Sequence, residues 1–109
     1  MDFNEYQKRA KETAIYPKMN PSWTFPAIGL SGETGELMEK LKKIIRDSDL
    51  KVTDEKLDSI KKELGDILWY LSAITTELNL SLDEIANDNI AKINSRKQRA
   101  VIKGEGDYR

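Results

Sequence analysis

Two pairs of acidic residues with the same spacing are the part of this sequence most able to do chemistry. Glu33 and Glu36 are three residues apart, and Glu63 and Asp66 repeat that spacing thirty positions later. On a helix, residues i and i+3 lie on one face, so each pair points to one side. Two like charges ~5 Å apart at an effective dielectric of ~20 repel by about 3 kcal/mol, so four gathered carboxylates need cations. Because oxygen donors suit hard divalent ions, the pattern predicts a Mg²⁺ site, with Mn²⁺ as a substitute.

The composition leaves little other catalytic chemistry available. The 109 residues include 18 Lys and Arg, 19 Asp and Glu, no His and no Cys. Without His and Cys, the chain has no thiolate or imidazole metal site, no disulfide framework and no nucleophile relay built on either residue. A net charge of −1 provides no basic field for a nucleic-acid polymer or an anionic membrane. If the protein is an enzyme, carboxylates must do most of the work.

The length and the first residues favour a cytoplasmic protein with one domain over residues 1–109. A chain of this length builds one small core, which a partner subunit can help to complete. The segment from Met1 to Glu5 lacks the basic and apolar regions of a leader peptide. No stretch approaches the ~20 apolar residues of a membrane span. Charged residues make up 34% of the chain, which favours amphipathic elements over fully buried ones.

Four amphipathic helices are expected to position these acids. Each one is indicated by apolar residues at helical spacing, by a capping residue, or by both. A loop marked by Pro17, Pro21 and Pro26 is expected after the first helix, and the tail from Arg99 to Arg109 shows no period. The expected helices are one with the stripe Phe3, Tyr6, Ala10 and Ala14, capped by Asp2 with Glu5; one over 27–45; one capped by Thr53 and ending near Asn79; and one capped by Ser81 with Glu84. No strand-like alternation competes, so the sequence predicts an all-α, four-helix bundle core.

The second and third of these helices resemble each other. Residues 32–45 align with 62–75, which places each acidic pair in the same phase relative to its apolar stripe. The first acid of each pair lies at the edge of the buried face, so packing of the two stripes would bring four carboxylates to one rim. Lys40, Lys42 and Lys43 are expected on the remaining surface of the second helix. An amphipathic period alone also produces such matches by coincidence.

Three glycines lie beside the acids. Gly32, Gly35 and Gly65 fall in segments that otherwise read as helix, where each costs roughly 1 kcal/mol relative to Ala. Close approach of the helices, or of a ligand, is one explanation. The alternative is that the helix simply begins after Gly32 and Gly35.

Basic and aromatic residues supply candidate contacts for a phosphorylated ligand. Asn89, Lys92 and Arg96 share one face of the fourth helix, where Arg and Lys can hold phosphate oxygens. The alternative is a solvated basic face favoured by the helix dipole. Tyr70 and Trp23 are candidates for stacking on a base, against ordinary packing, whereas Trp69 is expected in the core.

These residues together resemble the MazG-like nucleotide pyrophosphohydrolases of the all-α NTP pyrophosphatase superfamily. The resemblance is carried by the segments 29–37 and 63–71, which look like the ExxE and ExxD signature, by Asn89 to Arg96, and by the tail 102–109. It covers nearly the whole chain, although only one such domain is present. It implies homodimers or homotetramers and Mg²⁺-dependent hydrolysis of nucleoside triphosphates to monophosphate and pyrophosphate. Glu33, Glu36, Glu63 and Asp66 would be the metal ligands, Lys92 and Arg96 the phosphate contacts, and Asn89 and Tyr70 nucleotide contacts.

The hypothesis that follows is metal-assisted attack of water on the α-phosphorus. The acids would hold the ions and one acid would take the proton of the water, while Lys92 and Arg96 stabilise the leaving pyrophosphate. Glu39 extends the acidic row, and pairing with Lys42 or Lys43 is preferred for it over assistance to metal or water. Two alternatives stay open: a non-catalytic helical interaction module, and a superfamily relative that acts on dUTP or phosphoribosyl-ATP.

Overall fold

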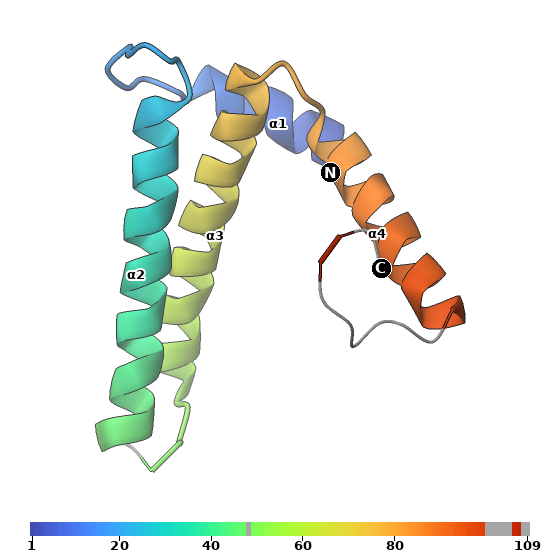
Figure 1. The fold of residues 1–109 in the computed structure, drawn as a ribbon. Coiled ribbons are helices and arrows are strands. Elements are labelled where there is room, and N and C mark those ends of the chain that lie inside the picture. Colours follow the sequence, from blue (N-terminus) through green and yellow to red (C-terminus); the bar gives the residue numbers. More distant parts are fainter. Residues whose placement is uncertain (48, 100–105, 108–109) are drawn as a thin grey trace.

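The described part of the chain forms four helices, which confirms the all-α prediction. The computed structural model describes residues 1–47, 49–99 and 106–107. Figure 1 shows that α2 and α3 lie side by side and run in opposite directions, while α1 crosses one end of the pair and α4 leads away from it. The helices are α1 (Phe3–Glu12), α2 (Thr24–Asp47), α3 (Asp54–Glu77) and α4 (Leu82–Gln98).

Side-chain caps begin three of the helices where the sequence indicated. The side chains of Asp2, Thr53 and Ser81 each accept a hydrogen bond from the backbone N–H three residues later, at Glu5, Lys56 and Glu84. Such a bond satisfies one of the amide groups that a helix N-terminus leaves without a partner. After α3, Asn79 adopts a left-handed φ of 57°, which ends the helix as predicted.

The start of α2 differs from the prediction. The helix begins at Thr24, before the expected residue 27, and Pro26 lies in its first turn rather than in a loop. Proline is tolerated there because the first-turn amides have no helical acceptor in any case. Pro26 is fully buried, so it anchors the helix end that precedes the acidic pair. The glycines at 32 and 35 are therefore inside the helix, and the explanation that the helix begins after them is wrong.

Aromatic and amide contacts fix the end of the molecule where α1 meets the helix pair. The ring of Tyr16 stacks on Phe25 at 5.6 Å and meets Trp69 edge-on at 6.2 Å. Trp69 also donates its indole N–H to the hydroxyl of Thr13 at 2.9 Å. Gln7 of α1 donates to the carbonyl of Leu80 and accepts from the amide of Leu82, so it ties α1 to the turn between α3 and α4. Ala14, predicted in the first helix, lies beyond its end at Glu12.

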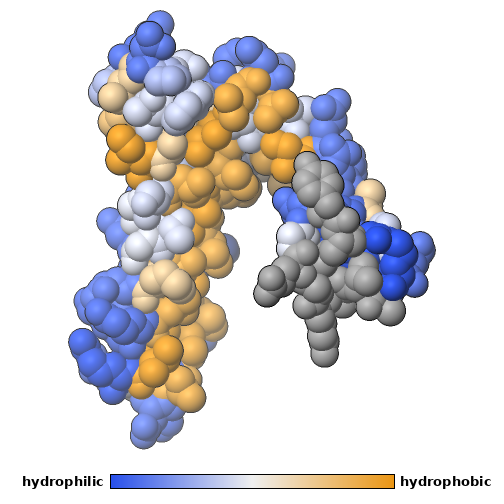
Figure 2. Space-filling view, viewed as in Figure 1, coloured by the Kyte–Doolittle hydropathy of each residue, from blue (hydrophilic) through white to orange (hydrophobic). Residues whose placement is uncertain are grey.

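A single chain leaves much of its apolar surface uncovered. The radius of gyration is 16.9 Å, whereas a compact chain of this length has about 13 Å. Helix α2 packs on α3, and α1 contacts both α3 and α4. Leucines recur every seven residues along α3 and at its C-cap, and all four stay between 38% and 53% exposed: Leu57, Leu64, Leu71 and Leu78. Figure 2 shows an apolar band along the side of α3 that faces α4.

Within the described ranges, no helix is both long and apolar enough to cross a membrane. Most of the tail that was predicted to be irregular, residues 100–105 and 108–109, lies outside the described residues.

Candidate metal and nucleotide site

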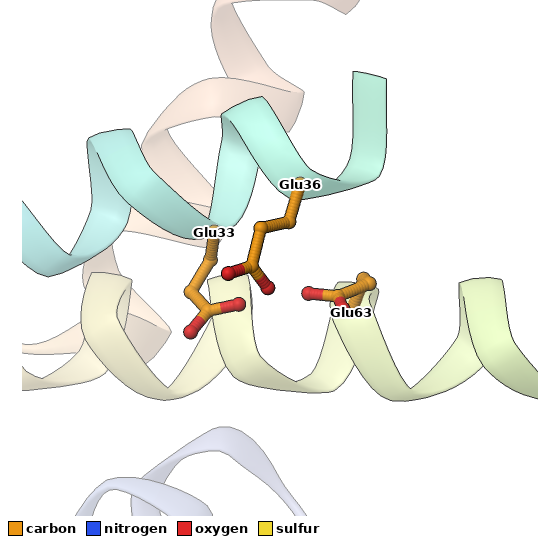
Figure 3. A group of neighbouring side chains, drawn as sticks. All are labelled: Glu33, Glu36 and Glu63. Atoms are coloured by element: carbon orange, nitrogen blue, oxygen red, sulfur yellow. The ribbon is translucent and has the colours of Figure 1, made fainter. Parts of the chain in front are cut away.

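Three of the four predicted acids meet between α2 and α3. Glu33 and Glu36 project from α2 and Glu63 from α3, and one carboxylate oxygen of each lies within 4.8 Å of the other two. Figure 3 shows the three side chains directed toward one another across the gap between the helices. Glu33 and Glu36 lie near the middle of α2 and Glu63 near the middle of α3, so the antiparallel packing of the two helices brings these three residues together. The predicted convergence is therefore a property of the fold, since residues 27 and 30 positions apart in sequence share one site.

Burial makes this cluster different from an ordinary acidic surface. Glu63 is only 7% exposed, and Glu33 is half-buried. Among the described residues, Oε2 of Glu33 and Oε2 of Glu63 are buried and have no hydrogen-bond partner. A buried carboxylate oxygen without a partner carries a large desolvation cost. These donors fit a hard divalent cation, which needs oxygen ligands and would satisfy both atoms.

The ionisation of the acids is uneven. A shared hydrogen bond with Glu63, followed by burial and by the charges of Glu36 and Asp66, raises the pKa of Glu33 to about 7. In contrast, the hydrogen bond from Lys40, followed by that from Glu33, lowers the pKa of Glu63 below its ordinary value. Without metal, a proton on Glu33 and the ammonium group beside Glu63 thus reduce the repulsion among the carboxylates.

Asp66 lies next to this group without belonging to it. It is exposed, and it is not among the three residues whose oxygens meet. Its charge nevertheless reaches the cluster, because it contributes to the raised pKa of Glu33 and of Tyr6 on α1. The structure therefore does not bring Asp66 into the group of oxygens that meet, and its role as a metal ligand stays a prediction.

Lys40 is a member of the site that the sequence did not reveal. Its Nζ lies 2.8 Å from Oε1 of Glu63 and 3.5 Å from the carbonyl oxygen of Ser59. The expectation that Lys40 lies on the remaining surface of the helix is wrong, since it sits in the seam between α2 and α3. A usable signal was present: Lys40 is four residues after Glu36 and seven after Glu33, on the same helix face.

The basic row of α4 is held by the tail of the same chain. Lys92 Nζ lies 3.0 Å from Oδ1 of Asp107, and Arg96 Nη2 lies 3.3 Å from the same oxygen and 3.1 Å from the carbonyl of Gly106. These two cations lower the pKa of Asp107. Arg96 is buried, whereas Asn89 is exposed beside Lys92. Helix α4 packs against α1, so the structure does not bring this row to the acids of its own chain.

The aromatic and glycine candidates divide between packing and open surface. Tyr70 packs over Gly29, where an added Cβ would lie 2.2 Å from the ring, and it meets Trp69 edge-on at 5.1 Å. Trp23 is 40% exposed just before α2. Among the described residues, and apart from the backbone of the same helix and the two chain neighbours, no atom lies within 4 Å of a Cβ added at any of the glycines beside the acids, Gly32, Gly35 and Gly65. The explanation that the helices pack closely at these three glycines is therefore wrong. The close contact is at Gly29, which the ring of Tyr70 covers.

Glu39 pairs with a neighbouring lysine. Lys42 Nζ lies 3.0 Å from Oε1 of Glu39, and both side chains are exposed. This bond, which is the main cause of the lowered pKa of Glu39, confirms the preferred salt-bridge interpretation.

The fold and the site together define a class of small all-α proteins in which an antiparallel helix pair gathers acids suited to divalent metal. The sequence profile of the MazG nucleotide pyrophosphohydrolase domain matches residues 27–101, and the chain belongs to this family. It is also similar to the Gene 37 protein of Mycobacterium phage L5, with 40% identity over an alignment that covers 100% of both chains. No solved structure matches the chain. The family assignment makes the protein a hydrolase of nucleotide phosphoanhydrides at the level of its class.

Proposed function

We propose that this protein is a Mg²⁺-dependent pyrophosphohydrolase that converts nucleoside triphosphates, ribo or deoxyribo, to monophosphate and pyrophosphate. The observation that carries the proposal is the meeting of Glu33, Glu36 and Glu63, two of which have buried oxygens without partners. The family assignment supports the same reaction. Mn²⁺ is expected to substitute, because both ions accept all-oxygen ligand sets.

In the proposed mechanism, the chain's acids hold and orient the reacting groups. Glu33, Glu36 and Glu63, with Asp66 as the fourth ligand, bind the metal, which when bound neutralises phosphate charge and promotes ionisation of water. One of these carboxylates takes the proton of the attacking water, so no His is required. Holding the water in line with the α-phosphorus supplies much of the rate gain through orientation.

The basic row is proposed to bind the phosphates of the leaving pyrophosphate. Lys92 and Arg96 provide charge-assisted donors, and Asn89 lies on the same face. Within one chain the row pairs with Asp107 and is on a helix that packs against α1. We therefore propose that the row serves the acid cluster of a second copy. Tyr70 and Trp23 are the proposed contacts for the base; the exposure of Trp23 favours it for this role.

A homo-oligomer is proposed because the single chain is open and apolar where a partner would pack. The leucines at positions 57, 64, 71 and 78 recur every seven residues, which is the spacing of a helix–helix seam. An apolar row of this length is normally covered by another protein surface. A homodimer is the simplest closed assembly that covers it, and a homotetramer follows if two dimers associate.

The test is hydrolysis of a nucleotide panel by the full chain with Mg²⁺, with both products identified by chromatography and mass. The panel includes canonical triphosphates, dUTP and phosphoribosyl-ATP, so that the substrate class is decided in the same assay. Glu36→Gln and Asp66→Asn should each abolish pyrophosphate release while far-UV circular dichroism is unchanged. Glu39→Gln is the matched control, since Glu39 pairs with Lys42 outside the cluster, and should stay active. Full activity of the Glu36 and Asp66 variants, or no hydrolysis by the wild type, would favour a non-catalytic helical module.

A further inference from the structure

The ammonium group of Lys40 is built into the acid cluster. We propose that Lys40 is an internal counter-cation that lowers the affinity of the cluster for free metal ions, so that the ion binds together with its nucleotide. Lys40 Nζ lies 2.8 Å from Oε1 of Glu63, whose side chain is 9% exposed, while the lysine side chain is 36% exposed. The inference rests on the proposed function, because it assumes that the acids bind metal and a triphosphate.

Charge balance explains why the lysine is needed. A buried carboxylate such as Glu63 is strongly destabilising without a partner, and Lys40 supplies one in the metal-free protein. A divalent cation coordinated by the remaining oxygen of Glu63 would lie close to that ammonium, and like charges repel strongly at half-buried sites. Lys40 therefore opposes the binding of free metal even though it keeps Glu63 ionised and ready to act as a ligand.

A bound triphosphate changes the sign of this interaction. Its anionic oxygens offer the ammonium a new partner, so the repulsion from the metal is offset by attraction to phosphate. Lys40 also has room to move, because it lines a pocket of about 310 Å³ in the same seam, together with Lys43 and Lys56. The coupling is reciprocal: a nucleotide that raises the affinity for metal must itself bind more tightly when metal is present.

The counter-cation role and a merely structural role predict opposite effects. If Lys40 only supported the fold of the cluster, removing it would weaken metal binding. If it acts as a counter-cation, removing its charge tightens the binding of metal alone. The sign of the change in metal affinity therefore decides between the two.

The experiment is calorimetric titration of Mn²⁺ into the full chain, with and without a non-hydrolysable nucleoside triphosphate analogue. Lys40→Met should bind Mn²⁺ alone about tenfold more tightly than the wild type and lose most of the enhancement by nucleotide, a size typical of coupled sites. Lys42→Met is the matched control, because Lys42 is on the same helix but pairs with Glu39 at the surface. This control should match the wild type in both titrations.

Each outcome has a defined meaning. Weaker Mn²⁺ binding by Lys40→Met, or behaviour identical to Lys42→Met, would overturn the counter-cation role and leave the proposed function standing. No Mn²⁺ binding by the wild type, even with the analogue, would overturn the proposed function and this inference with it. Should Lys40→Met fail to fold by circular dichroism, Lys40→Gln keeps a hydrogen-bond donor for Glu63 without the charge, and the same tightening is expected.

Discussion

The raised pKa of Glu33 reflects the crowding of acidic groups in the metal-free cluster. Its pKa of about 7, against an ordinary 4.5, has the bond with Glu63 as its first cause and the burial of the group as its second. The folded state therefore holds a proton that the unfolded chain has already released. The stability that this proton provides is fully present below pH 4.5 and is lost as the pH rises to about 7.

Replacement of the Glu33 carboxyl by a neutral amide should remove this fall in stability at high pH. Without metal, Glu33→Gln should be more stable than the wild type above pH 7 by about 1 kcal/mol after allowance for solvent screening, or roughly 4–8 °C in Tm. Below pH 4.5 the two proteins should differ much less, because Glu33 is then protonated in both states. Thermal unfolding followed by circular dichroism in EDTA, at pH 4.5 and pH 8, measures the difference.

The matched control is Glu39→Gln, whose carboxyl has a lowered pKa and lies outside the cluster. This variant should be no more stable than the wild type at pH 8. Added Mn²⁺ should stabilise the wild type more than Glu33→Gln, because the variant has lost a ligand. A stability difference for Glu33→Gln that does not change with pH would contradict the assigned pKa.

At the scale of helices, the sequence determines more of the fold than of the site. The caps at Asp2, Thr53 and Ser81 and the stop at Asn79 were predictable, because each depends on local backbone hydrogen bonds. The meeting of Glu33, Glu36 and Glu63 was also predictable, because the two helices carry matched acids in matched phase. Periodicity reports which face of a helix is apolar, but it does not report which residue of a neighbouring helix lies opposite.

That limit explains the residues that were placed wrongly or missed. The helical period predicts Lys40 on the surface of its helix, outside the apolar stripe, and only the seam with α3 reveals its bond to Glu63. The pairing of Lys92 with Asp107 likewise depends on the path of the chain after α4. The sequence predicts Pro26 in a loop, since the rule that a first helical turn tolerates proline does not identify where that turn begins.

The glycines give a test at this scale, because Gly29 and Gly35 lie on one helix in opposite surroundings. Gly29→Ala places a Cβ against the ring of Tyr70 and should destabilise by about 1–3 kcal/mol. The Cβ of Gly35→Ala would extend into open space, so this variant should stabilise the protein by up to about 1 kcal/mol through its higher helix propensity. Thermal unfolding measures both changes, which should differ in sign.

The activity of Gly35→Ala then reports what uses the open space beside Glu36. If a nucleotide or a second copy approaches there, the variant should lose turnover although its Tm rises. A gain in stability with unchanged turnover would show that the space serves neither purpose. Equal stability changes for the two variants would contradict the packing of Tyr70 on Gly29.

At the scale of the whole molecule, the open shape of the single chain affects both its stability and its function. The single chain extends over 44 × 42 × 28 Å, and its leucine row on α3 stays exposed. Its acids are on α2 and α3, whereas α4, which carries the basic row, packs against α1. A second copy would cover the leucines, and in the proposed arrangement it would also bring its α4 to the acids of the first. In this arrangement, catalysis requires assembly, because a complete site forms only when two copies pack together.

Mixing two defective variants tests this arrangement. Glu36→Gln lacks an acid, and Lys92→Gln should lower turnover at least about tenfold through loss of a charge-assisted phosphate contact. If each site combines the acids of one copy with the basic row of another, every mixed dimer contains one intact site. With equal amounts and free exchange of subunits, half of the dimers are mixed, so activity should recover to about a quarter of the wild-type value.

A site formed within one chain predicts a different result, namely the average of the two separate variants. Leu64→Gln, placed in both variants, is the control for assembly, because Leu64 is 52% exposed at the middle of the leucine row. Light scattering should report a monomer for the Leu64 variants, and their mixture should not recover activity. The average of the two separate activities, in a mixture that light scattering shows to be dimeric, would separate the two requirements and place the basic row in the site of its own chain.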